Sequence, residues 1–111
     1  MLYVAVRAAR RAGDLIMRAF DARGFAVEEK SDRDFVTEVD REAQRVIVRE
    51  IRRHFPEHGI VAEEDIPVRH PDAAVKWYID PLDGTTNFVY GYPHFCVSIA
   101  AWRFGKPEIA V

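Results

Sequence analysis

Apolar residues recur every three to four positions in two long stretches of the chain, residues 4–21 and 38–54. This spacing predicts two amphipathic helices that each bury one face. We expect Gly24 to end the first helix and Thr37 to cap the second, with Asp40 completing a capping box. The predicted buried face of the first helix is Val6, Ala9, Gly13, Ile16, Met17 and Phe20.

Shorter apolar segments bounded by turn residues predict strands. The first two flank the polar turn "SDRD" and predict a hairpin, and the last two are joined at "RFGK". The chain stops within its last strand pattern, which predicts a cut rather than a natural terminus. The predicted strands are "FAVEEK" (25–30), "DFVT" (34–37), "GIVA" (59–62), "VKWYID" (75–80), "HFCVSIAAW" (94–102) and "KPEIAV" (106–111).

The composition is that of one globular domain, with 111 residues, 49% hydrophobic and 31% charged residues. A formal net charge of -2 gives no electrostatic footprint for nucleic acid, and no apolar run has membrane-spanning length. We therefore expect neither nucleic acid nor a membrane as partner. Cys96 is the only cysteine, which excludes an internal disulfide, fits the cytoplasm and predicts a buried, inert thiol.

The segment "WYIDPLDGTTNF" places two acids where an apolar strand ends. Pro81 cannot donate a hydrogen bond to a sheet, so the chain can turn there and direct Asp80 and Asp83 into one volume. Glu63, which also follows a predicted strand, joins them if the two strands are neighbours. Clustered carboxylates repel one another unless a cation neutralises them, and oxygen ligands, including the Leu82 carbonyl, suit Mg²⁺ or Mn²⁺.

The following "GTTNF" predicts a helix start, with Gly84 allowing close approach and Thr85 or Thr86 capping the first turn. Free N–H groups at such a start bind phosphate, which nearby acids would repel unless a divalent metal lay between them. This combination indicates a phosphate-ester hydrolase. An isolated acid–glycine pair is more often a turn, and a lone threonine more often a cap, but the complete run favours the site.

"WYIDPLDGTTNFVY" (77–90) resembles the metal-binding signature of the inositol monophosphatase family. "KSDRDFVTEVD" (30–40), "PEHGIVAEED" (56–65) and "PHFCVSIAAW" (93–102) resemble further family motifs in the same order, and the first helix resembles that of bacterial members. The resemblance covers essentially the whole chain. It implies an α+β fold in which helices are layered on a mainly antiparallel sheet, here incomplete.

The resemblance also implies which residues bind metal. Glu63 and Asp80, with the Leu82 carbonyl, would bind a first Mg²⁺, and Asp80 and Asp83 would bind a second. Mn²⁺ is an alternative metal. Without the resemblance, Glu63 would more often be part of a solvated loop.

The same resemblance assigns catalytic and substrate contacts. Gly84 and Thr85 would offer N–H groups to the phosphate beside Asp83, and the Thr85 hydroxyl, oriented by Asp40, would position water for attack, with Glu63 as a further catalytic residue. Lys30 would lie near the metals, and Glu64 would support them from outside. Taken alone, Asp40 is more often a helix cap and Lys30 a surface charge.

The implied activity is Mg²⁺-dependent hydrolysis of a small phosphorylated polyol or sugar, foremost inositol 1-phosphate. Fructose 1,6-bisphosphate, a nucleotide 3′-phosphate and histidinol phosphate are alternatives, as is a catalytically silent binding module. Family members are about twice as long, and their second half supplies another metal ligand and most substrate contacts. We therefore expect residues 1–111 to form the N-terminal half of the domain, with poor activity alone and a homodimer at full length. A second departure, Ala62 in place of glycine before the acids, has little expected consequence.

Overall fold

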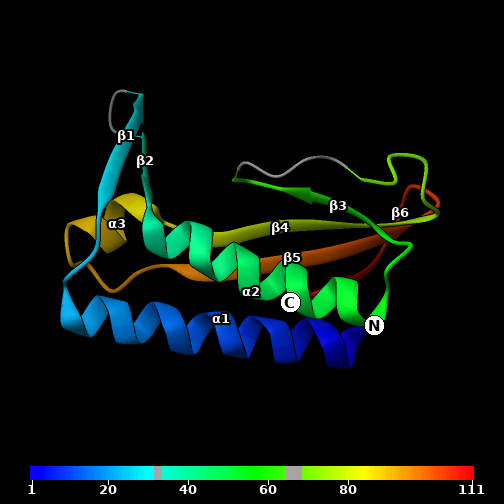
Figure 1. Cartoon of the computed structure of the whole chain (residues 1–111), viewed down its shortest axis with the longest axis horizontal. Coiled ribbons are helices and arrows are strands. Elements are labelled where there is room, and N and C mark those ends of the chain that lie inside the picture. The colour runs from blue at the N-terminus through cyan, green and yellow to red at the C-terminus, as the bar shows by residue number, and fades with distance from the viewer. Residues whose placement is uncertain (32–33, 65–68) are drawn as a thin grey trace.

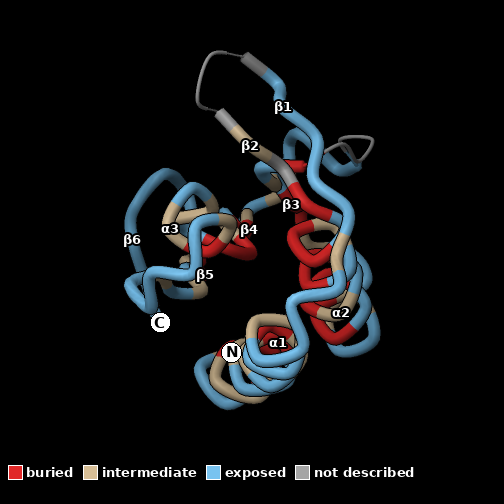
Figure 2. Tube along the Cα trace, turned by 90° about the vertical axis from the view of Figure 1, so that its left-hand side faces the viewer, coloured by how far each residue is buried: buried red, intermediate tan, exposed pale blue. Residues whose placement is uncertain are grey.

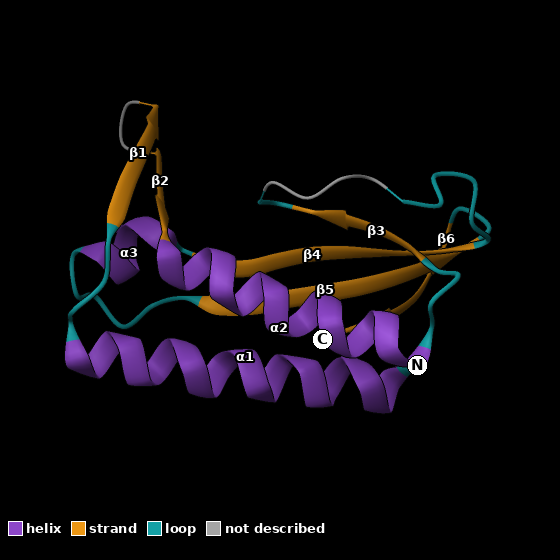
Figure 3. Cartoon of the chain, in the orientation of Figure 1, coloured by secondary structure: helices purple, strands orange, loops and turns teal. Residues whose placement is uncertain are grey.

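The computed structural model describes residues 1–31, 34–64 and 69–111, excluding the side chains of residues 31, 34 and 36. Two long helices cover one face of a four-stranded sheet (Figure 1). Figure 3 shows both helices running along the same side of the strands. The elements are α1 Leu2–Ala22, β1 Val27–Ser31, β2 Asp34–Thr37, α2 Glu38–His54, β3 Gly59–Ala62, β4 Val75–Asp83, α3 Thr85–Val89, β5 Cys96–Arg103 and β6 Lys106–Ala110.

The four-stranded sheet has the order β3-β4-β5-β6. Strands β3 and β4 are parallel, whereas β4–β5 and β5–β6 are antiparallel. The layered α+β fold with a mainly antiparallel sheet is therefore confirmed. Because parallel strands end at the same edge of a sheet, the residues after β3 lie beside the end of β4. This pairing brings the two acidic segments of the sequence to one edge.

Strands β1 and β2 form the predicted antiparallel hairpin, whose turn residues 32 and 33 lie outside the described residues. The hairpin stands away from the sheet and its second strand contacts α3 (Figure 1). Strand β2 leads directly into α2 at Thr37. The Thr37 hydroxyl accepts hydrogen bonds from the backbone N–H groups of Val39 and Asp40, and the Asp40 carboxylate accepts one from the Thr37 N–H. The predicted capping box is confirmed.

The buried face of α1 differs from the predicted one. Met17 is 46% exposed, and the buried positions are Val4, Ala5, Ala8, Ala12 and Ile16. The small alanine side chains allow α1 to approach α2 closely along its length, which a count of large apolar residues does not reveal. The residue that ends the helix also differs, because Arg23 and not Gly24 adopts the left-handed cap conformation, with φ 61°.

The core lies between the helical layer and the inner face of the sheet. Figure 2 shows the buried residues of α2 on the side that faces the rest of the molecule. The largest fully buried apolar side chains are Trp77, Phe88, Ile16, Ile47, Ile51 and Ile99. In the part of the chain that the structure describes, no helix is long and apolar enough to cross a membrane.

Candidate active site

Strand β4 carries the first part of the site at its carboxyl end. Asp80 is half-buried, Pro81 and Leu82 are buried, and Asp83 is exposed. The pairing of β4 with β5 shifts register between Asp80 and Asp83, as expected where proline interrupts the ladder. The Leu82 N–H donates to the Asp80 carboxylate at 3.3 Å, which fixes the turn between the two aspartates.

The acids at this edge influence one another. Burial, followed by the negative charges of Glu63 and Asp83, raises the pKa of Asp80 to about 6, with a lowering effect of the Leu82 N–H hydrogen bond and a smaller raising effect of Asp40. The Glu63 N–H donates to the Ile79 carbonyl at 3.0 Å, so Glu63 continues the β3–β4 pairing past the end of β3. Glu63, Asp80 and Asp83 therefore lie close enough for their charges to interact, and their repulsion disfavours the full ionisation of all three carboxyl groups without a cation.

The turn into α3 depends on Gly84. Its φ of 99° is strained for residues with a side chain, and a Cβ there would lie 2.9 Å from the His94 carbonyl oxygen. No side chain caps the first turn of α3, whose N-cap is Gly84 itself, so the expected threonine cap is wrong. The Thr85 hydroxyl instead donates to the Asp40 carboxylate at 2.8 Å and to the Leu82 carbonyl at 3.0 Å.

Asp40 combines the two roles that the sequence left in competition. One carboxylate oxygen accepts from the Thr37 N–H and hydroxyl, and the other accepts from Thr85. The Asp40 side chain is 1% exposed, which makes its geometry rigid. The cap of α2 and the orientation of the Thr85 hydroxyl are thus two functions of one carboxylate.

The two glutamates after β3 take different environments. Glu63 is exposed, whereas Glu64 is buried and forms an ion pair with Lys30 at 2.9 Å. Lys30 therefore lies against Glu64 rather than on an isolated surface. The Gln44 side chain, which the sequence analysis did not single out, bonds both backbone groups of Glu64. Its signal in the sequence was an amide among the apolar residues of the second helix.

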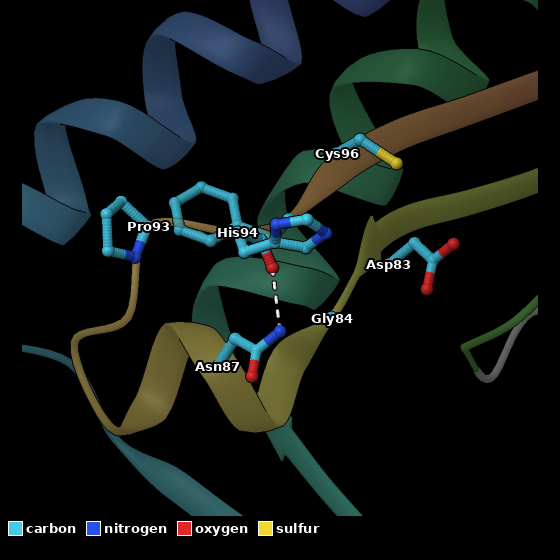
Figure 4. Close-up of a pocket in the computed structure, with 7 residues that line it drawn as sticks. Asp83, Gly84, Asn87, Pro93, His94 and Cys96 are labelled. Atoms are coloured by element: carbon cyan, nitrogen blue, oxygen red, sulfur yellow. Dashed lines mark hydrogen bonds between the residues drawn. The ribbon is translucent and has the colours of Figure 1, made fainter.

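A pocket of about 380 Å³ adjoins Asp83 and Gly84, with Asn87, Pro93, His94, Phe95 and Cys96 completing its lining (Figure 4). The Asn87 side chain donates to the His94 carbonyl at 2.8 Å across the pocket. Cys96 is exposed, so the expected burial is wrong. It pairs with Asp83 at the start of β5 and lies on the same face of the strand as the exposed Ser98, opposite the face that buries Ile99 and Ala101. Burial, followed by the charges of Asp83 and Asp80, raises the pKa of the Cys96 thiol.

The model of the family described as "Inositol monophosphatase family" matches residues 1–111. The chain belongs to the inositol monophosphatase family. The resemblance inferred from the sequence is thereby confirmed, and so is the phosphatase-type fold.

Similar proteins and structures support this membership. The chain is 50% identical over 111 residues to the Nus factor SuhB of Vibrio cholerae, covering 99% of this chain and 42% of that protein. The SuhB structure from Bartonella henselae superposes with a TM-score of 0.94 at 36% identity, over 99% of this chain and 43% of that one. The Thermotoga maritima inositol monophosphatase gives a TM-score of 0.88 at 43% identity, over 99% of this chain and 42% of that one. The chain thus spans less than half the length of these relatives.

One similar structure is an inositol monophosphatase/NADP phosphatase complexed with Mg²⁺ and phosphate. The donors of this chain fit a hard divalent cation in kind, because the negative charges of Glu63 and Asp83 act on Asp80 and disfavour its ionised form. Their arrangement is not a closed cage. Among residues 1–31, 34–64 and 69–111, no group of three or more His, Cys, Asp or Glu side chains converges enough to hold an ion.

Proposed function

We propose that this chain carries part of the active site of a Mg²⁺-dependent phosphomonoesterase that acts on inositol 1-phosphate. The observation that carries the proposal is the hydrogen bond from the Thr85 hydroxyl to Asp40, beside the Asp80–Asp83 turn. A buried carboxylate that orients a hydroxyl next to clustered acids is suited to position water for attack on a phosphate ester. Family membership and the solved inositol monophosphatases support the same reaction class.

The proposed metal ligands are Glu63, Asp80 and the Leu82 carbonyl for one ion, and Asp80 and Asp83 for a second. When bound, Mg²⁺, or Mn²⁺ in its place, supplies a Lewis acid and neutralises the negative charge of these carboxylates. Asp83 is proposed both to bind metal and to contact the substrate.

The remaining proposed roles belong to hydrogen-bonding groups. The Gly84 and Thr85 N–H groups bind the phosphate, and the close packing of Gly84 against the His94 carbonyl fixes their direction. Asp40 accepts the Thr85 hydroxyl proton in a hydrogen bond, which leaves the hydroxyl oxygen free to accept one from water. Glu64 forms an ion pair with Lys30, and this pair holds in place the backbone that carries Glu63.

The substrate is proposed as a small phosphorylated polyol or sugar. Fructose 1,6-bisphosphate, nucleotide 3′-phosphates and histidinol phosphate are proposed alternatives. One similar structure, at 30% identity and a TM-score of 0.72, is a phosphatase for both inositol phosphate and NADP. That dual description supports the inclusion of nucleotide phosphates among the compounds to be tested.

A second candidate function is a binding module without catalysis. The Nus factor SuhB proteins of Vibrio cholerae and Escherichia coli, each 50% identical to this chain, are not named for a hydrolytic activity. The open arrangement of the acids among the described residues also favours this candidate. These names give no support to our expectation that nucleic acid is not a partner. That expectation, the homodimer and the cytoplasmic location stay predictions.

The decisive experiment measures phosphate release from inositol 1-phosphate by the chain with and without Mg²⁺. We expect slow, Mg²⁺-dependent release that Asp83→Asn abolishes, because the amide removes a negative metal ligand. Asp72→Asn is the matched control, since Asp72 is an exposed acid in the segment before β4. Equal rates for Asp83→Asn and the unmodified chain would refute the metal assignment.

The same assay across a panel of phosphomonoesters orders the substrates. Absence of release from every ester, together with undetectable Mg²⁺ binding by calorimetry, favours the silent module.

A further inference from the structure

Gln44 is a buried polar residue on the apolar side of α2. Its side chain is 2% exposed and lies one turn after Asp40. Burying an amide is unfavourable unless its donor and acceptor are both satisfied. Neighbouring positions of the same helix, Ala43 and Ile47, bury ordinary apolar side chains. A glutamine at this position therefore calls for a specific partner.

Both ends of the Gln44 amide bind the same residue. The Glu64 N–H donates to the Gln44 side-chain oxygen at 2.8 Å, and the Gln44 side-chain nitrogen donates to the Glu64 carbonyl at 2.9 Å. A primary amide offers a donor and an acceptor side by side in one plane. Gln44 thus pairs with the backbone after β3 as a neighbouring strand would.

This pairing fixes a turn that β4 also holds. The Glu63 N–H is bonded to the Ile79 carbonyl at 3.0 Å, so β4 binds one residue of the turn and α2 binds the next. The carboxylates of Glu63 and Glu64 therefore lie in different surroundings. Glu64 is buried against Lys30, whereas Glu63 is exposed and its charge acts on Asp80.

One helix thereby positions both parts of the site. Asp40 and Gln44 are four residues apart, so they lie on the same face and about 6 Å apart along the axis. Asp40 holds the Thr85 hydroxyl on one side, and Gln44 holds the turn of Glu63 and Glu64 on the other. The relative placement of Thr85 and Glu63 therefore depends on the spacing of two side chains on a rigid helix.

We propose that Gln44 is a positioning residue that directs the Glu63 carboxylate toward Asp80. The metal-binding consequence rests on the proposed function, whereas the structural consequence does not. Groups that orient metal ligands from outside typically change metal affinity 10–100-fold when they are removed. We therefore expect the loss of Gln44 to weaken Mn²⁺ binding about 10-fold without removing any ligand.

The test compares Gln44→Met with Glu50→Met. Both variants replace a buried polar side chain of α2 by an unbranched apolar one. Among the described residues, the ion pairs of Glu50 are to Arg7 and Arg11 on α1 and to His54, none of which belongs to the site. Mn²⁺ titrations followed by calorimetry give the affinities, and amide hydrogen exchange gives the protection of the Glu64 N–H. We expect Gln44→Met to lose that protection and about 10-fold in Mn²⁺ affinity, with Glu50→Met unchanged in both.

Gln44→Glu provides a second variant if Gln44→Met does not fold, because it keeps the acceptor for the Glu64 N–H. We expect it to retain protection of that N–H while weakening Mn²⁺ binding, since the bond to the Glu64 carbonyl is lost. Retained protection in Gln44→Met, or equal Mn²⁺ affinities for it and Glu50→Met, would overturn the proposal. If the unmodified chain binds no Mn²⁺, the proposed metal site fails, and the exchange of the Glu64 N–H alone decides the role of Gln44.

Discussion

Asp40 and Glu50 are two buried carboxylates on the same helix, 1% and 3% exposed. They lie ten residues, or about 15 Å, apart along α2. Glu50 is bound by Arg7 and Arg11 of α1, each at 3.2 Å. Asp40 accepts hydrogen bonds from Thr37 and Thr85, and the ion pairs among the described residues include none to Asp40.

The difference separates a structural acid from one suited to chemistry. Arg7 and Arg11 neutralise the Glu50 carboxylate where the two helices meet, so the charge of this buried acid is compensated. Asp40 instead lies near Glu63, Asp80 and Asp83, and its charge contributes to the raised pKa of Asp80. Among the described residues no ion pair to Glu63, Asp80 or Asp83 is found, so their negative charges at this end of the helix would be relieved by a cation from solution.

The largest expected effect comes from removing the cations that neutralise Glu50. Replacing Arg7 and Arg11 together by leucine leaves a buried carboxylate without a cation, apart from the more distant His54. We expect the free energy of unfolding to fall by about 3 kcal/mol in urea denaturation. Adding Glu50→Leu should restore part of this loss, because no charge is then buried. A triple variant no more stable than the double variant would contradict the role assigned to these ion pairs.

A smaller effect is expected at the other end of α2. Thr37→Ala removes the acceptor for the Val39 and Asp40 N–H groups and a donor to the Asp40 carboxylate. Loss of such a buried cap should cost about 2 kcal/mol of unfolding free energy. Thr37→Ser keeps the hydroxyl and serves as the control. Similar losses in both variants would attribute the effect to the threonine methyl group instead.

Asp40→Asn tests charge at nearly constant shape. The asparagine keeps an acceptor for Thr37, so the unfolding free energy should fall by only about 1 kcal/mol. Mg²⁺-dependent phosphate release should fall more than in Glu50→Gln, because Asp40, unlike Glu50, is bonded to the Thr85 hydroxyl. If both variants reduce release in proportion to their loss of stability, Asp40 has no role beyond the cap.

The smallest effect is a change in titration. Because the pKa of Asp80 is raised in the folded chain to about 6, from an ordinary value of 3.8, its protonated form favours folding. Its contribution to stability therefore decreases as the pH rises from about 3.8 to about 6. Carboxyl ¹³C NMR should give a midpoint near pH 6 that falls in Glu63→Gln. An unchanged midpoint in that variant would show that the two acids do not interact.

Much of the architecture was predictable from local patterns. The bounds of α2 and its capping box followed from helical spacing and from Thr37 and Asp40, because caps are interactions between near neighbours in sequence. The hairpin and the strands also followed from local apolar segments. The assigned roles of the site residues stay predictions, although the Thr85–Asp40 hydrogen bond has the geometry that the resemblance implied.

The errors at Met17 and Cys96 share a physical cause, unlike the local errors at the caps of α1 and α3. The burial of Met17 and Cys96 depends on which segment covers each position, and neither helical spacing nor strand apolarity contains that information. The role of Gln44 was not predicted because its partner is the backbone of Glu64, 20 residues away in sequence. Any residue type at that position would offer the same backbone groups, so the sequence gives no signal of the pairing.

The sequence by itself determined the helices, the strands, the cap and the acidic segments, since these depend on interactions within a few residues. Only the tertiary structure decided which acids are neutralised, because Arg7 and Arg11 approach Glu50 through helix packing, whereas parallel pairing of β3 with β4 brings Glu63 to Asp80. Charge compensation is a property of distances in space, and those distances are set when the layers pack.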